Sequence, residues 1–450
     1  MAEADEQHSE SGRVAAHPWR LAEQEPTNLI ALWPDDQPPT KTEIVTALSE
    51  YFGRKITMLE ELAEDDPEVA WCFAAKLPTL AAPVVFWSEP AQPLPSEEAA
   101  QPGAQQCKWL VGIETLLTAE DPLTDYSNLM RALAGALTDV LAVLDVNTAL
   151  WHPRRELDEV FASDEVEPPA DVLWVVQAVQ AARDSGDEGR LVWLHTHGLW
   201  RCNAPELEML EVPLDYAEPA AELINDIAAL LLEQSPPRPG EPFEIGPDLQ
   251  VMLHPAHIVA PLLTRDTPGS MNDRSEENGA NPHGGIRAVI CAVSPPENPG
   301  KIWAWPREVT RRWMADEAAI YMTTRATERQ AALARAVWGQ FATAFASIAR
   351  HPCEAGDESG VVFGVKAGFA ENDSNEHLWF EVCRFEADRV EGRLVNQPLA
   401  VKRLSKGDRA WITRGQISDW RVVTQDGCYG PNDLASLWRA IDALKRDPER

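Results

Sequence analysis

The sequence predicts an α+β protein with two parts. The first consists of mixed or antiparallel sheet layers covered by helices, and the second of a small curved antiparallel sheet, or partial barrel, with one long helix. Short β-branched and aromatic runs separated by turn-rich segments recur along the chain, as is typical of strands. Longer segments carry apolar residues at steps of three and four, as is typical of helices packed on a sheet. The 450 residues exceed the size of one hydrophobic core, so several domains are expected.

Residues 1–26 are acidic and predict a disordered tail. The segment that follows alternates strand and helix patterns. A helix at 40–52 places Ile44, Leu48 and Phe52 four residues apart, on one face. Strands are expected at 28–33, 69–76, 83–87, 108–114 and 143–150, a second helix at 126–141, and an exposed Pro- and Glu-rich loop at 89–106.

The strand pattern continues at 171–179, 190–197 and 206–212. A helix follows at 218–233, with a buried face made of Leu223, Ile224, Ile227, Leu230 and Leu231. Residues 266–285 are rich in Asn, Gly, Ser and charge, and they predict a linker between an α+β domain at 27–265 and a C-terminal region at 286–450. A further strand at 287–293 fits either side of that linker.

The C-terminal region predicts a helix packed on a small sheet. Runs at 361–366 and 378–382 flank a turn-rich segment and should pair antiparallel, and further strands are expected at 389–395 and 410–413. The helix covers 325–348. Its apolar stripe consists of Leu333, Val337, Phe341, Phe345 and Ile348.

Three stretches of this region carry a family resemblance: 360–369 (GVVFGVKAGF), 375–382 (NEHLWFEV) and 417–420 (ISDW). With their neighbours they resemble the YegJ-like domain, a bacterial family of unknown function, over about 325–423. The residues that give the likeness are Glu376, His377, Trp379, Gly392, Asn396, Pro398, Gly407, Asp408, Asp419 and Trp420. The resemblance implies no catalytic role, so we expect these residues to shape turns and fill the core.

A second resemblance lies further upstream. The stretches 194–201 (LHTHGLWR) and 205–210 (PELEML) are similar to a motif of another bacterial family of unknown function. That family often precedes a YegJ-like domain, so the tandem order supports both resemblances. It implies no activity.

The formal net charge of −33 is unevenly distributed. Residues 361–450 contain fourteen basic and fourteen acidic side chains, so the whole excess lies on residues 1–360. Phosphate backbones are repelled by such a surface, which disfavours nucleic-acid binding. A protein partner with a basic surface, or solubility alone, explains the charge better.

The sequence also predicts a compartment. No apolar run approaches the roughly eighteen residues of a membrane helix, and the first residues are acidic instead of basic and then apolar, so we expect no membrane association and a cytoplasmic location. The seven cysteines are scattered and never form a Cys-x-x-Cys motif, so neither a disulfide framework nor a thiolate zinc site is expected.

One group of residues has the composition of a metal site. His195 and His197 lie two residues apart on an expected strand, so their side chains share a face about 6.6 Å apart at Cα. Glu206 and Glu208 have the same spacing. If a hairpin places His197 opposite Glu206, His195 lies opposite Glu208, and all four side chains could hold zinc or another divalent ion. Cross-strand polar pairing without a metal is the alternative.

Two classes of function follow. The first is a non-enzymatic protein-binding or regulatory protein, in a setting such as defence or toxin neutralisation. The second is a metal-dependent enzyme that uses the His/Glu face. No nucleophile elbow, phosphate-binding loop, dinucleotide motif or His-Glu-x-x-His helix is present, and no catalytic or cofactor-binding residue is assigned.

Overall fold

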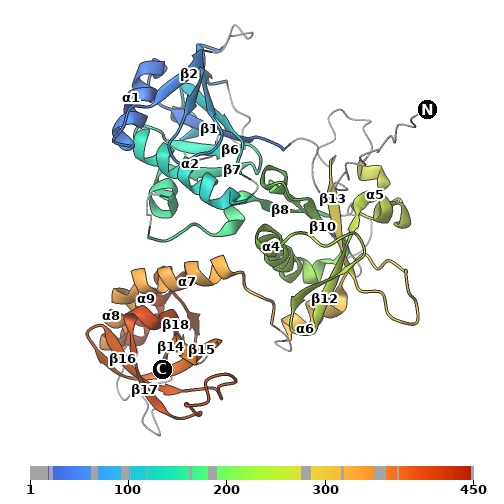
Figure 1. Ribbon diagram of the computed structural model, residues 1–450, viewed down its shortest axis with the longest axis vertical. Coiled ribbons are helices and arrows are strands. Elements are labelled where there is room, and N and C mark those ends of the chain that lie inside the picture. Colours follow the sequence, from blue (N-terminus) through green and yellow to red (C-terminus); the bar gives the residue numbers. More distant parts are fainter. Residues whose placement is uncertain are drawn as a thin grey trace, which may run out of the picture. The chain divides into compact units, whose positions relative to one another are not determined.

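The chain folds into two compact units (Figure 1). The first unit consists of Met1–Glu159 and Ala170–Tyr321, and the second of Val160–Pro169 and Met322–Arg450. The computed structural model describes Trp19 and residues 24–61, 69–92, 101, 103–118, 120–161, 165–180, 190–274, 285–315, 319–348, 361–371 and 374–446. Helices and strands are both abundant in both units, so the α+β class is as predicted.

The division between the units does not fall at the predicted linker, 266–285. Strand β13 (Arg287–Ala292) follows that segment and pairs with both β10 (Glu206–Pro213) and β12 (Leu249–Pro255). Because β13 lies inside a sheet of the first unit, the chain cannot divide before it. The short segment 160–169 belongs to the second unit, where Glu167 forms an ion pair with Arg325.

The first sheet has seven strands in the order β2-β3-β4-β5-β1-β6-β7, all antiparallel. They are β1 (Thr27–Trp33), β2 (Thr57–Glu61), β3 (Trp71–Lys76), β4 (Val84–Pro90), β5 (Trp109–Thr115), β6 (Ala142–Asp145) and β7 (Leu150–Pro153). Helix α1 (Lys41–Tyr51) begins at a capping box between Thr40 and Glu43 and packs on α2 (Pro122–Ala136).

The second sheet has six strands in the order β11-β12-β13-β10-β9-β8. Only β10 and β13 run parallel, so the sheet is mixed, as predicted. The remaining strands are β8 (Val175–Gln180), β9 (Leu191–His197) and β11 (Pro242–Gly246). Helix α4 (Ala217–Glu233) covers β8, β9 and β10 with the apolar face that its sequence predicts.

Short helical segments connect these elements. They are η2 (Ala104–Gln106), α3 (Arg154–Glu156), η3 (Leu157–Phe161), η4 (Ala170–Leu173), η5 (Leu199–Cys202), η6 (Leu214–Tyr216), α5 (Ala256–Val259), η7 (Ala260–Leu262), η8 (Met271–Arg274) and α6 (Arg307–Met314). The segments η5 and η8 matter most here because both carry residues of the buried network described below.

The second unit contains a six-stranded antiparallel sheet in the order β17-β16-β15-β14-β18-β19. Its strands are β14 (Val362–Glu371), β15 (Ser374–Glu386), β16 (Arg389–Leu394), β17 (Arg409–Thr413), β18 (Ile417–Thr424) and β19 (Gly427–Tyr429), with the turn η10 (Arg414–Gln416). In the described part of the unit β17 and β19 do not pair with each other, so the sheet is not a closed barrel. Its core includes Phe341, Phe380 and Trp420.

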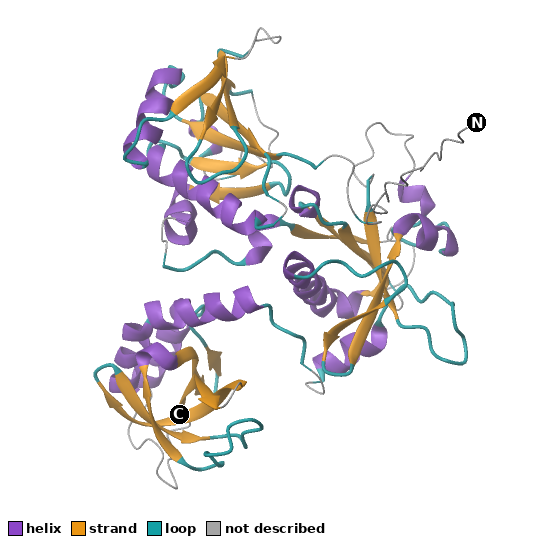
Figure 2. Ribbon diagram, viewed as in Figure 1, coloured by secondary structure: helices purple, strands orange, loops and turns teal. Residues whose placement is uncertain are grey.

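The single long helix expected over 325–348 is two helices, α7 (Thr324–Ala336) and α8 (Trp338–Ile348). The backbone leaves the helical range at Val337 (ψ 16°). The break lets Trp338 stack on both Phe341 and Phe385, with ring centroids 5.1 Å apart in each pair. A third helix, α9 (Leu434–Arg446), packs beside α8, and Figure 2 shows all three helices on one side of the sheet.

The predicted disorder of residues 1–26 is wrong at two described positions. Trp19 is buried, and its indole Nε1 donates to the carbonyl of Pro237 over 2.5 Å. Gln24 donates through Nε2 to the carbonyls of Leu117 and Arg201. Aromatic burial and these hydrogen bonds fix both positions, whereas residues 1–18 and 20–23 lie outside the described residues.

One cysteine differs from the expectation that the chain has no disulfide. Cys383 is disulfide-bonded, although the sequence predicts no disulfide. Cys72, Cys107, Cys202, Cys291 and Cys428 form no disulfide. None of the helices in the described part of the chain combines the length and the apolar composition needed to cross a bilayer.

Candidate functional site

The predicted histidines and glutamates lie on neighbouring strands of the second sheet. Strands β9 and β10 run antiparallel, and His195 lies opposite Glu208 in the register that the sequence analysis derived. On the other side of β10, strand β13 places Arg287 opposite Glu206. Both glutamates and His195 are buried.

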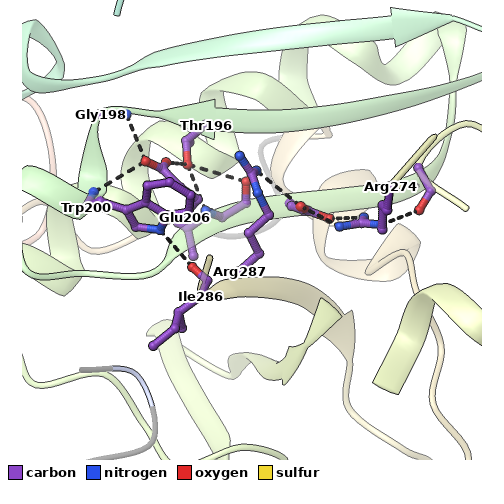
Figure 3. A network of polar contacts seen from close by, with 10 residues as sticks. Thr196, Gly198, Trp200, Glu206, Arg274, Ile286 and Arg287 are labelled. Atoms are coloured by element: carbon purple, nitrogen blue, oxygen red, sulfur yellow. Dashed lines mark hydrogen bonds and ion pairs between the residues drawn. The ribbon is translucent and has the colours of Figure 1, made fainter. Parts of the chain in front are cut away.

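Glu208 is held by two arginines. Arg274 donates to the carboxylate through both terminal nitrogens, and Arg287 donates through Nη1 over 3.2 Å (Figure 3). Arg274 also donates through Nε to the carbonyl of Gly269 over 2.9 Å, which fixes the loop that carries it. All three charged side chains are almost wholly buried. Removing one member of such a group leaves an uncompensated buried charge and costs about 3–5 kcal/mol.

Glu206 faces a different set of donors. Its Oε2 accepts from the hydroxyl of Thr196 over 2.5 Å, and its Oε1 accepts from the backbone N–H groups of Gly198 and Trp200 over 2.8 and 3.3 Å (Figure 3). Burial raises the pKa of Glu206, while the Thr196 hydrogen bond and the charge of Arg287 act in the opposite direction. The carboxylate therefore anchors the turn between β9 and η5.

The tight geometry of that turn explains its glycine. Gly198 has a φ of +116°, and a Cβ at this position would lie 2.3 Å from the carbonyl oxygen of Leu173. A side chain is therefore excluded both by conformation and by contact. The backbone N–H of Gly198 can point at Glu206 only because the chain takes this shape.

The histidines belong to an aromatic stack. The His195 ring lies 4.3 Å from the Trp193 ring and 4.9 Å from the His197 ring, centroid to centroid. The guanidinium of Arg274 lies 4.9 Å from the centroid of the Trp193 ring. This cation–π contact stabilises the stack.

The four predicted metal ligands therefore do not converge. Glu206 and Glu208 accept from Thr196, from backbone N–H groups and from two arginines, while His195 stacks on Trp193 and His197 lies edge-on to His195. Across the residues that the structure describes, His, Cys, Asp and Glu side chains form no group of three or more that could hold a metal ion. The register of His195 and Glu208 is as expected, and both carboxylates accept hydrogen bonds from protein donors.

A second buried charge group links the first two sheets. Arg201 donates through Nη1 to Asp145 over 2.7 Å, and through Nε and Nη2 to the carbonyl of Leu173. Tyr126 donates its hydroxyl to the same Asp145 oxygen over 2.8 Å and lies under the guanidinium. Burial and the charge of Asp145 raise the pKa of Tyr126 well above its usual value. No local pattern predicts this group, and its sign in the sequence is an arginine inside the apolar stretch 198–202 (GLWRC).

The motif residues of the second unit have structural contacts. The carboxylate of Glu376 accepts from the backbone N–H groups of Leu399, Ala400 and Val401 over 2.8, 2.8 and 3.0 Å. His377 contacts Ser418 through Nδ1 at 2.7 Å, at the point where β18 shifts register against β14. Through these contacts both residues hold chain segments together.

The other motif residues fill turns and the core, as expected. Three side chains accept hydrogen bonds: Asn396 from the N–H of Trp379, Asp408 from the N–H of Ser405, and Asp419 from Gln330 and the N–H of Trp420. Pro398 and Trp420 are buried, and Trp420 donates to the carbonyl of Ala334. Gly407 has a φ of +93°, and a Cβ on Gly392 would lie 2.7 Å from that of Phe380. Trp379 differs from the expectation: it lies half-exposed on the outer face of the sheet, 4.9 Å below the guanidinium of Arg421.

Comparison with known families gives two matches. Residues 176–286 match a family described as "Protein of unknown function (DUF4026) C-terminal". Residues 326–447 match a family described as "Uncharacterized protein conserved in bacteria (DUF2314)". The chain carries two domains of unknown function. This confirms the tandem order that the sequence predicts, while the YegJ-like name stays a prediction.

The first match runs from β8 to just beyond η8 and contains Glu206, Glu208 and Arg274, whereas Arg287 lies directly after its end. The second contains all six strands of the second unit. No curated protein and no solved structure matches the chain. The contacts of the chain's own residues are therefore the basis for any function.

Proposed function

We propose that the protein acts by binding another protein that presents a basic surface, and that it catalyses no reaction of its own. Neutralising a basic toxin is one role of this kind. The observation that carries the proposal is a row of carboxylates on α4, formed by Glu218, Glu222 and Asp226 and called the α4 acidic row below. These residues lie at steps of four, so they share one side of the helix.

The α4 acidic row is not neutralised within the chain. Glu218 and Glu222 are exposed, Asp226 is half-buried, and none of the three forms an ion pair with any residue that the structure describes. Carboxylates four residues apart on a helix repel each other and destabilise it by a few tenths of a kcal/mol. The raised pKa of Asp226, about 6, has burial and the charge of Glu222 as its causes. A basic partner surface would relieve this repulsion.

The buried charge groups support the non-enzymatic part of the proposal. Glu206 and Glu208 each accept several hydrogen bonds from the chain itself, and Arg201 and Asp145 pair with each other. A general base or nucleophile needs a proton or a substrate atom within hydrogen-bond reach. These carboxylates are instead enclosed by protein donors, as is typical of groups that stabilise a fold.

Affinity capture tests the proposal. The full-length chain, used as bait in an extract of its native host, should recover one basic protein in stoichiometric amount. The variant Glu218→Gln/Glu222→Gln should lose it, because two of the three row charges are gone. A control variant, Glu50→Gln/Glu60→Gln, removes two exposed charges from the first sheet and its helix and should retain the partner. The proposal would be contradicted if the α4 variant recovered as much partner as the wild type, or if repeated experiments recovered no partner.

A further inference from the structure

One loop of the second unit has a charge opposite to that of the chain. The connection between β16 and β17, residues 395–408, is called the basic loop here. It contains three basic side chains, Lys402, Arg403 and Lys406, and one acidic side chain, Asp408. All three basic residues are exposed. The chain as a whole carries a net charge of −33, so this concentration of positive charge is local.

Two glutamates hold the basic loop in one conformation. The Glu376 carboxylate accepts from three consecutive N–H groups, those of residues 399 to 401. The Glu371 carboxylate accepts from the next two, those of Lys402 and Arg403, over 3.1 and 3.3 Å. Pro398 and Val401 are buried beneath. A loop ordered in advance loses little conformational entropy when it binds.

The basic loop presents an apolar side chain to solvent. Leu399 is 81% exposed, the highest value for a large hydrophobic residue within the described ranges. Val395 is 48% exposed at the start of the same loop. Leucine next to cations, on a fixed backbone, has the composition of a small docking surface with an apolar centre and a charged rim. Its complement would be an acidic surface with an apolar position.

The α4 acidic row supplies such a complement. Its three carboxylates span about 12 Å at the helical rise of 1.5 Å per residue. The half-buried Ala221 and Ala229 lie among them on the helix and offer small apolar positions for a leucine. Both surfaces belong to the same chain, and their net charges are opposite in sign.

We infer that the basic loop docks on the α4 acidic row of a second copy of this chain. Lys402 and Arg403 then neutralise the row, and Leu399 contacts its alanines. The inference rests on the proposed function because it uses the same acidic row, and it implies that self-association and binding of a basic partner exclude each other. In a two-fold dimer the contact forms twice, once in each direction. At physiological salt the screening length is about 8 Å, which weakens repulsion between distant acidic surfaces more than attraction between contacting charges.

Sedimentation of the full-length chain tests the inference. The wild type should form a dimer with a Kd in the micromolar range. Leu399→Asn and Lys402→Glu/Arg403→Glu should each raise that Kd by at least about tenfold. Val362→Asn, an exposed apolar residue on β14, serves as the matched control and should leave the Kd unchanged. Circular dichroism of each variant checks the fold.

A charge-swap experiment gives the decisive result. Lys402→Glu/Arg403→Glu and Glu218→Lys/Glu222→Lys should each be monomeric alone, because loop and row then carry like charges. Mixed together they should form a heterodimer, because both contacts become complementary again. A monomeric wild type, a dimer insensitive to the loop substitutions, or a mixture that stays monomeric would overturn the inference.

The same variants separate this inference from the proposed function. Leu399→Asn should abolish self-association and still allow the chain to capture a basic partner through the α4 acidic row. Dimerisation of the wild type without capture of a partner would overturn the proposed function alone. Capture by a wild type that is monomeric would overturn the self-association alone.

Discussion

Arg201 donates to Asp145 over 2.7 Å, and neither side chain is exposed to solvent. Asp145 ends β6 of the first sheet, and Arg201 lies in η5 of the second, so this ion pair joins the two sheets of the first unit. The hydroxyl of Tyr126 and the carbonyl of Leu173 complete its hydrogen bonds. A fully satisfied buried pair of this kind specifies how two layers meet.

Asp145→Asn should destabilise the first unit strongly. The substitution removes the carboxylate that pairs directly with the buried Arg201 guanidinium, which should lower the free energy of unfolding by about 3–5 kcal/mol. Chemical denaturation measures the change. Asp158→Asn, which removes the partner of Arg154 in a solvent-exposed pair, is the matched control and should cost no more than about 1 kcal/mol. Equal losses of unfolding free energy in the two variants would show that the buried pair stabilises the fold no more than the exposed pair does.

Glu208→Gln should cost more stability than Glu206→Gln. The first substitution removes the carboxylate that contacts both Arg274 and Arg287, with an expected loss of about 3–5 kcal/mol. A glutamine at 206 keeps an oxygen for the N–H groups of Gly198 and Trp200, so its loss should be about 1–2 kcal/mol. Thermal melting compares the pair, and the reverse order would refute this assignment of roles.

Asp226→Asn should stabilise the protein near neutral pH and much less in acid. The folded pKa of Asp226, about 6, lies above the ordinary value of 3.8 because of burial and the charge of Glu222. A carboxyl with a raised folded pKa contributes stability below its unfolded pKa and loses it as pH rises through the folded value. The gain above pH 6 should be about 1 kcal/mol, since the group is partly exposed to solvent. Melting curves at acid and neutral pH measure it.

The control for this experiment is Asp215→Asn, at an exposed position just before the helix. Its effect on stability should be smaller than that of Asp226→Asn at neutral pH. Glu222→Gln should act in the same direction as Asp226→Asn, because it removes the neighbouring charge. A stabilisation by Asp226→Asn of equal size at both pH values would refute the assignment.

Glu376→Ala should release the basic loop. The carboxylate accepts from three backbone N–H groups, and their hydrogen bonds lower its pKa. Because the folded pKa is lowered, these hydrogen bonds stabilise the loop at neutral pH, and the stabilisation is lost as pH falls. Hydrogen exchange at residues 399–401 should become at least about tenfold faster in the variant. Glu386→Ala, an arginine-paired carboxylate on the same strand, should leave those amides unchanged.

The sequence by itself determined the elements whose pattern is local. The apolar steps of α4 predict its buried face because every residue of that face contacts the same sheet. The two-residue spacing of the strands predicted His195 opposite Glu208 once a hairpin was assumed, because an antiparallel register fixes every later pair. The tandem order of two families of unknown function was also readable, since it depends on motifs that are contiguous in the chain.

Only the tertiary structure decided which partners the charged side chains take. Glu208 pairs with Arg274 and Arg287, which follow it by 66 and 79 residues, and no local spacing relates them. The same holds for β13, which joins the first unit across the segment expected to be a linker, and for the break at Val337, which the aromatic core of the second unit requires. Contacts between distant segments depend on how the layers pack, and a one-dimensional pattern records only the face on which a side chain lies.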